Sequence, residues 1–197
     1  ASKYGLQFGP DPASAERATM GGVIGNNATG AHSILYGMAA DHLLEADVIL
    51  SDGSLAKFGE RIMEDGGWRL EGGYHDPLTM IHDSIDQIRT KYSDAIQQHF
   101  PKSWRNSAGY RLNYLLPWSP SAPPQWVGHV YPADLRTSTF NLASLLAGSE
   151  GTLAVIRRVK LNLVPKPKHT ILGVLAYDSI PAACDDVPRL LEFHPSA

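Results

Sequence analysis

The stretch "LLEADVILSDGSLAKFGE", residues 43–60, predicts a β-hairpin. Its first part alternates Leu44, Ala46, Val48 and Leu50 with Glu45, Asp47 and Ile49, the period of a half-buried strand. Asp52-Gly53 follows, and this pair favours a tight turn because both residues tolerate positive φ. Residues 55–58 then form the return strand. A hairpin is antiparallel, so the chain is expected to build an antiparallel sheet.

Residues 76–101 predict the longest helix. Asp76 is a suitable N-cap, Pro77 fits the first helical position, and Pro101 stops the helix. Apolar residues recur every three or four positions and form one stripe, which a helix buries against a core. The stripe contains Leu78, Ile81, Ile85, Ile88, Tyr92 and Ile96.

A second helix-and-strand pair is predicted in residues 141–165. Asn141 can cap a short helix, Gly148 is suited to end it, and Pro165 ends the strand that follows. One strand face is expected to carry Leu153, Val155, Val159, Leu161 and Leu163, with Arg157 breaking the pattern.

The last part of the sequence predicts one more strand and helix. Residues 169–180, "HTILGVLAYDSI", are rich in strand-forming residues, and residues 181–193 form a helix that Pro188 interrupts. Residues 117–132 contain five prolines and two tryptophans and predict a long irregular insertion. Together these elements predict an α+β fold, an antiparallel sheet with flanking helices.

Composition excludes several functions. The 197 residues carry a net charge of −3 and no long basic run, so no nucleic-acid partner is expected. The chain has a single cysteine, Cys184, which excludes an all-cysteine metal or iron–sulfur site, and its eight histidines are scattered, so no metal site is predicted. The absence of a signal peptide and of disulfides favours a cytoplasmic location.

The stretch "ATMGGVIGNNATG", residues 18–30, holds four glycines and two asparagines and no charge. Glycines allow positive φ and a close approach of the main chain to a ligand, and asparagines donate and accept hydrogen bonds. From these residues alone, a structural turn and a cradle for a polar, partly anionic, flat ligand are equally favoured. "GGVIG" is not GxGxxG, and "GSEGT" (residues 148–152) lacks the lysine of a Walker A loop.

The order of motifs resembles one known family. "FGPDP" (8–12), the glycine stretch, "ILYG" (34–37), "SAGYRLNYLL" (107–116) and "LLAGSEGTLAVIRRVKLNLVPKPK" (145–168) follow one another as in FAD-linked oxidases. These belong to the PCMH-type, or vanillyl-alcohol-oxidase, superfamily, and the likeness is strongest to its glycolate oxidase and D-lactate dehydrogenase group.

The resemblance implies a domain division and a cofactor site. Residues 1–166 would form the second lobe of a PCMH-type FAD-binding domain, and residues 167–197 the start of a ferredoxin-like α+β cap domain, truncated here. The FAD-binding residues it implies are Pro10, Thr19, Met20, Gly21, Gly22, Gly25, Asn26, Asn27, Gly30, Glu150, Gly151 and Ile156.

The resemblance also implies a reaction. Members of the group oxidise 2-hydroxy acids such as D-lactate or glycolate by hydride transfer to FAD, and pass electrons to a quinone, cytochrome or iron–sulfur partner, which here would lie outside the chain. The first lobe of the FAD domain, with its "RGGGTS" diphosphate loop, and nearly all of the cap domain have no counterpart in these residues. The chain is therefore expected to be part of a longer protein, to bind FAD weakly or not at all alone, and to be inactive alone.

Two alternatives stay open. One is an FAD oxidase of the alditol or aromatic alcohol type, and the other is a non-catalytic binding or assembly module. A peripheral membrane location through the full-length protein is an alternative to a purely cytoplasmic one. No catalytic residue is assigned. His32 is interpreted as a loop histidine and Tyr110 and Tyr114 as packing residues, while Arg111 is assigned either a carboxylate contact or a surface role.

Overall fold

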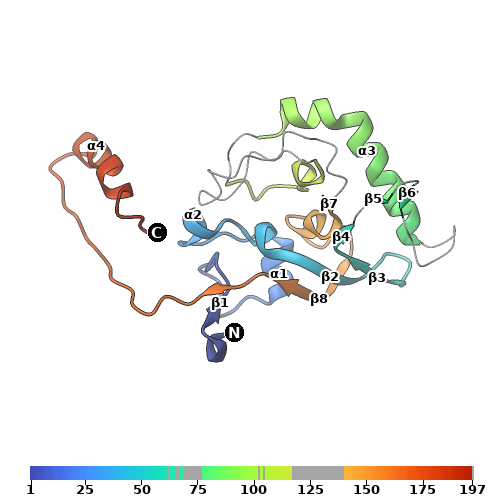
Figure 1. Cartoon of the computed structure of the whole chain (residues 1–197), viewed down its shortest axis with the longest axis horizontal. Helices are drawn as coiled ribbons and strands as arrows, with labels where there is room; N and C mark the ends of the chain where they lie inside the picture. The colour runs from blue at the N-terminus through green and yellow to red at the C-terminus, as the bar shows by residue number, and fades with distance from the viewer. Residues whose placement is uncertain are drawn as a thin grey trace.

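The computed structural model describes residues 1–61, 63–64, 67–68, 77–101, 103, 105–116 and 140–196 (Figure 1). The predicted N-cap Asp76 and the predicted proline-rich insertion, residues 117–132, lie outside these residues. The described part combines helices with antiparallel sheets, so the α+β prediction is confirmed.

Short elements dominate the described part of the chain, which has two longer strands and two longer helices. In chain order they are η1 (Ser2–Tyr4), β1 (Leu6–Gln7), α1 (Met20–Gly25), α2 (Ser33–Tyr36), η2 (Ala39–His42), β2 (Leu43–Ile49), β3 (Leu55–Phe58), β4 (Glu60–Arg61), β5 (Met63–Glu64), β6 (Gly67–Trp68), α3 (Pro77–His99), η3 (Leu112–Leu115), β7 (Phe140–Asn141), η5 (Leu142–Leu146), β8 (Val155–Leu161), β9 (Val164–Pro165) and α4 (Ile180–Leu191).

The central sheet has the strand order β3-β2-β8, and both pairings are antiparallel. The predicted hairpin is confirmed, since β2 and β3 pair with Ala46 opposite Phe58 and Ile49 opposite Leu55. Ser54 donates its main-chain N–H to the Asp52 carboxylate across 2.9 Å and stabilises the turn. Ala46 and Val48 point into the core and are almost fully buried.

Two β-bulges between β2 and β8 change which side chains reach the core. The pairing shifts between Leu43 and Glu45, so Leu43 is buried while Leu44, predicted to be on the apolar face, is 41% exposed. The second shift leaves Arg157 unpaired, and the strand face changes there because side chains alternate along a strand. Ile156 therefore packs against the core. Val155, predicted to share a strand face with Val159 and Leu161, is 64% exposed, so the prediction is wrong for this residue.

The predicted long helix is confirmed as α3, which begins at Pro77 and ends before Pro101. Ile85 and Ile96 of its apolar stripe are buried. Arg89 fixes the helix to η3, because its Nε donates to the carbonyl oxygen of Leu115 across 2.7 Å. The helix thus covers η3 and the residues that precede it in the chain.

The helix after Asn141 is also confirmed, as the 3-10 helix η5. Asn141 caps it by accepting from the N–H of Ala143 at 2.9 Å, and its side-chain amide donates to the carbonyl of Leu43 at 2.8 Å. The residues of η5 are all buried and form the centre of the core with α1, β2 and η3. Gly148 follows with φ of 82°, as expected of a residue that ends a helix.

The chain leaves this body after the short pairing of β1 with β9 (Figure 1). The strand predicted for residues 169–180 is not present: residues 169–179 are irregular, and Ile171 and Val174 are 92% and 85% exposed. A strand needs a neighbour to take up its main-chain hydrogen bonds, and none of the described strands pairs with this segment.

The last predicted helix is confirmed as α4, with Ser179 accepting from the N–H of Ala182 as its N-cap. Pro188 lies inside α4 and does not interrupt it, contrary to prediction. No residue of α4 is buried. Among the helices described, none combines the length and apolar character needed to cross a membrane.

Candidate cofactor site

The glycine stretch, residues 18–30, contains the short helix α1 at Met20–Gly25, where the sequence favoured either a structural turn or a ligand cradle. Thr19 is the N-cap of α1, and its hydroxyl oxygen accepts from the main-chain N–H of Gly22 at 3.2 Å. None of its four glycines has a positive φ; the left-handed residue is Asn27, with φ of 44°. The glycines therefore serve close approach, and the expectation that they supply positive φ is wrong.

Helix α1 packs directly on the segment that leads into β8. A Cβ atom added to Gly21 would lie 3.9 Å from the Cβ of Ile156, and one added to Gly25 would lie 3.9 Å from the Cα of Glu150. The main-chain N–H of Glu150 donates to the carbonyl of Gly25 across 2.9 Å. Two segments that are distant in the sequence and were both predicted to bind the cofactor are thus brought together.

The turn before β8 exposes main chain beside α1. Glu150 and Gly151 have φ of 50° and 79°, so two successive residues are left-handed. Both are exposed, as are Thr19, Met20, Gly22 and Asn26 of the α1 segment. Six of the predicted residues therefore share access to solvent around one helix–turn contact, where a ligand can reach main-chain and amide groups.

Pro10 and Gly30 form a second contact. A Cβ atom on Gly30 would lie 1.9 Å from the carbonyl oxygen of Asp11 and 2.3 Å from that of Pro10, so only glycine fits. The hydroxyl of Ser33 donates to the carbonyl of Pro10 at 3.5 Å. Asp11 itself is left-handed, with φ of 49°. This contact holds the turn at residues 9–12 against the end of the glycine stretch.

Asn27 faces the interior. It is fully buried, and its Oδ1 accepts from the N–H of Ala40 at 2.9 Å. Its Nδ2 donates to the carbonyl of Asn106 at 3.4 Å and lies 3.8 Å from the sulfur of Met38. The Asn27 side chain therefore ties the glycine stretch to two other segments and is not turned toward an external ligand.

Tyr110 and Thr152 form a contact beside the site that sequence reasoning missed. Their hydroxyl oxygens lie 2.9 Å apart. The Thr152 hydroxyl donates to the carbonyl of Ser149 at 2.6 Å, so Tyr110 must be the donor in the pair. Tyr110 is 43% exposed and joins residues 106–111 to the turn before β8. The sequence carries no signal for this pairing, because 42 residues separate its members.

Behind the site lies a buried polar cluster of Arg111, Tyr114 and Asp41. Arg111 is fully buried, so its predicted surface role is wrong. Its guanidinium lies 4.6 Å from the centre of the Tyr114 ring and donates to the carbonyl of Asn106. The Tyr114 hydroxyl donates to the carboxylate of Asp41, which also accepts from the N–H of Met38 at 2.7 Å.

The electrostatics of this cluster follow from its burial. Removal from water raises the pKa of Asp41, and the hydrogen bonds from Tyr114 and Met38 offset part of that rise. Burial, together with the negative charge of Asp41, raises the pKa of Tyr114. The tyrosine thus keeps its proton at neutral pH, and its hydroxyl donates a hydrogen bond to the Asp41 carboxylate.

The comparisons with known proteins agree with the resemblance. A family model described as "FAD binding domain" matches residues 1–59, which include Pro10 and the whole glycine stretch. This match supports FAD as the cofactor.

Similar proteins cover nearly the whole chain. D-2-hydroxyglutarate dehydrogenase of Pantoea ananatis is 29% identical over 189 residues, which are 96% of this chain and 17% of that protein. D-lactate dehydrogenase of Archaeoglobus fulgidus is 27% identical over 88% of this chain and 23% of its own length. Glycolate oxidase subunit GlcD of Bacillus subtilis is 23% identical over 95% of this chain and 25% of its own length. The chain thus spans about a quarter or less of these relatives.

Proposed function

We propose that this chain is the flavin-binding part of an FAD-dependent oxidoreductase that oxidises a 2-hydroxy acid. FAD accepts the hydride of the substrate in such enzymes. The proteins similar to this chain are named for D-2-hydroxyglutarate, D-lactate and glycolate, which share the 2-hydroxy acid group. The electron acceptor, a quinone, cytochrome or iron–sulfur module, lies outside these residues, and the proposed location is cytoplasmic.

One observation carries the proposal. The segment matched by the FAD binding domain family, residues 1–59, contains helix α1, and α1 contacts the second predicted cofactor segment at residues 150–156. Close contact of two glycine-bearing segments leaves main chain exposed at their junction, and glycine main chain suits a ligand that carries phosphate groups.

The predicted residues divide into two roles under this proposal. Those that are exposed would contact FAD: Thr19, Met20, Gly22, Asn26, Glu150 and Gly151. Those that are packed would hold the exposed ones in place, and they are Pro10, Gly21, Gly25, Asn27, Gly30 and Ile156. Glu150 is the only acidic residue of the two groups, so its carboxylate has to turn away from the phosphates.

We also propose that the FAD-binding part ends near residue 166 and that residues 167–197 begin a cap domain. Val164 is the last buried residue described, and the chain beyond it is exposed up to α4. Helix α4 has apolar residues on one side and buries none of them against the rest of the described chain. An apolar face of this kind suits packing within another domain.

FAD titration of the full-length protein that contains this chain tests the cofactor assignment. Gly22 is exposed, and a Cβ there would meet only the Thr19 hydroxyl at 3.5 Å, so Gly22→Val adds bulk to the proposed contact surface. Gly173→Val is the matched control, because nothing lies within 4 Å of a Cβ at that position. Flavin fluorescence should show at least about tenfold weaker binding for Gly22→Val and no change for Gly173→Val. Equal affinities for the two variants would contradict the proposed surface.

Substrate tests use the full-length protein that contains this chain. Bleaching of the visible flavin absorption by D-lactate, glycolate or D-2-hydroxyglutarate under anaerobic conditions is the expected result. Bleaching by an alditol or an aromatic alcohol, with no response to the three acids, would favour the other oxidase class. A folded full-length protein that binds no flavin would favour a binding or assembly module.

A further inference from the structure

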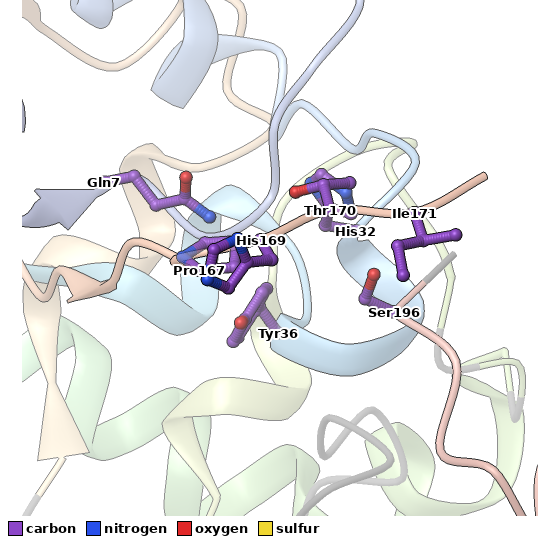
Figure 2. A pocket seen from close by; sticks show the side chains of 8 residues that line it. All are labelled: Gln7, His32, Tyr36, Pro167, His169, Thr170, Ile171 and Ser196. Carbon is purple, nitrogen blue, oxygen red and sulfur yellow. The ribbon is translucent and has the colours of Figure 1, made fainter.

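A separate pocket lies between β1, α2 and the segment after β9 (Figure 2). The pairing of β1 with β9 sets Gln7 opposite Val164, and the main-chain N–H of Lys166 donates to the carbonyl of Gly5 at 2.8 Å. The chain then passes over α2 as a strap, defined here as residues 166–171. The eight residues that line the pocket are Gln7, His32, Tyr36, Pro167, His169, Thr170, Ile171 and Ser196.

Two glycines that do not line the pocket allow close packing around two of its lining residues, Tyr36 and His32. A Cβ on Gly9 would lie 2.8 Å from the Cβ of Tyr36, so Tyr36 can pack against bare main chain there. Gly30 allows the Asp11 turn to approach α2, and Oδ2 of Asp11 lies 3.1 Å from Nδ1 of His32. Since Nδ1 faces Asp11, Nε2 is the ring nitrogen that a ligand in the pocket would contact.

The chemistry of the pocket favours an anion. Six of the eight lining residues have side chains that can donate a hydrogen bond, and none of the eight is a carboxylate. The strap also carries two lysines, Lys166 and Lys168, which do not line the pocket themselves. Among the described residues, no group of three or more His, Cys, Asp and Glu is placed to hold a metal ion, so the two histidines do not indicate a metal site.

The size of the pocket limits which ligands can fit. Its volume is about 140 Å³. Pockets for drug-sized ligands measure roughly 300–1,000 Å³, so this one does not hold a whole dinucleotide. We propose that the pocket binds a small oxyanion, a carboxylate or a phosphate group, through His32 and His169. The inference does not depend on FAD, since none of the predicted FAD-binding residues lines the pocket.

Nuclear magnetic resonance tests the proposal on the whole 197-residue chain without flavin. Sodium acetate, D-lactate and phosphate are each added at constant ionic strength, with chloride as the balancing salt. The ring C–H signals of His32 and His169 should shift and saturate, with a Kd on the order of 1–10 mM. Saturation by acetate and D-lactate alone identifies a carboxylate site, and saturation by phosphate alone a phosphate site.

Three variants complete the test. His169→Gln, on the exposed strap, should weaken binding about tenfold and leave the thermal midpoint unchanged, and His32→Gln should weaken it similarly. His99→Gln is the control, since His99 lies exposed at the end of α3. Shifts that do not saturate, that chloride reproduces, or that persist unchanged in His169→Gln would overturn the proposal. None of these results bears on FAD binding, which is measured separately by flavin fluorescence.

Discussion

The side-chain oxygen of Asn27 accepts a hydrogen bond from the main-chain N–H of Ala40 across 2.9 Å. Through this bond and the one to the carbonyl of Asn106, a single fully buried amide connects the glycine stretch, the start of η2 and the residues before η3. An amide suits this place because it donates and accepts at once and carries no charge that burial would penalise.

Asn27→Ala should therefore destabilise the protein by about 2–4 kcal/mol. The substitution leaves the N–H of Ala40 without its partner and puts a non-glycine, non-asparagine residue at φ of 44°. Urea unfolding followed by circular dichroism measures the change. The neighbouring Asn26→Ala is the control, because Asn26 is exposed, and it should cost less than about 0.5 kcal/mol. Similar losses of unfolding free energy for the two variants would show that the buried Asn27 amide contributes no more to stability than the exposed Asn26 amide.

Gly30→Ala should destabilise the protein by more than about 3 kcal/mol or prevent folding. The added Cβ would lie 1.9 Å from the carbonyl oxygen of Asp11, so the main chain would have to move. Gly173→Ala is the matched comparison, since the added methyl group meets no atom within 4 Å. Thermal unfolding of both variants gives the measurement, and a Gly30→Ala protein as stable as Gly173→Ala would refute the observed packing.

Thr19→Ala should cost about 1 kcal/mol, the usual loss when an N-cap hydroxyl is removed. The Thr19 hydroxyl oxygen accepts a hydrogen bond from the main-chain N–H of Gly22 at 3.2 Å. Helix α1 has only six residues, so few other interactions within the helix compensate for the lost cap. Thr19→Ser keeps an oxygen in the same place and should stay within about 0.5 kcal/mol of the original protein. If serine and alanine destabilise equally, the lost methyl contacts and not the cap explain the effect.

The raised pKa of Asp41 predicts a specific pH dependence. Its value in the unfolded chain is near 3.8, and burial raises the pKa in the folded state. The folded protein therefore holds this proton more tightly, and stability falls as the pH rises above about 4 until the folded-state pKa is passed. Each unit of the rise corresponds to about 1.4 kcal/mol.

Urea unfolding at several pH values, compared between the original protein and Asp41→Asn, isolates this contribution. The difference in unfolding free energy should decline from about pH 4 upward, because only the original protein ionises at position 41. Asp52→Asn is a control in which stability should change with pH in the opposite direction, since the Ser54 hydroxyl and N–H lower the pKa of Asp52. Its stabilising contribution should disappear below about pH 4, and a flat difference for Asp41→Asn would contradict the raised pKa.

The elements that sequence predicted correctly are those whose determinants are local. The β2–β3 hairpin follows from a strand-like alternation and an Asp-Gly turn, and α3 from a long apolar stripe bounded by prolines. Neither needs knowledge of a distant neighbour. The same holds for η5, whose cap Asn141 lies directly before it.

The errors arose where a distant segment decides the outcome. Helix α1 contains three glycines, which disfavour a helix locally, and its packing on residues 148–156 overrides that preference. Residues 169–180 have strand-forming side chains but no strand beside them in the described part of the chain. The inward turn of Ile156 depends on a bulge opposite β2, which alternation alone cannot reveal.

The place of β8 in the central sheet has a further consequence. Within the described residues, β8 pairs with a strand on one side only. Its other edge therefore has main-chain N–H and C=O groups that could pair with a strand of another molecule. Arg157, Arg158 and Lys160 are exposed along it, and Arg157 sits at the bulge. Cations and an irregular main chain both discourage a second molecule from adding to the sheet. These residues should protect the protein from aggregation while it is being synthesised and folded.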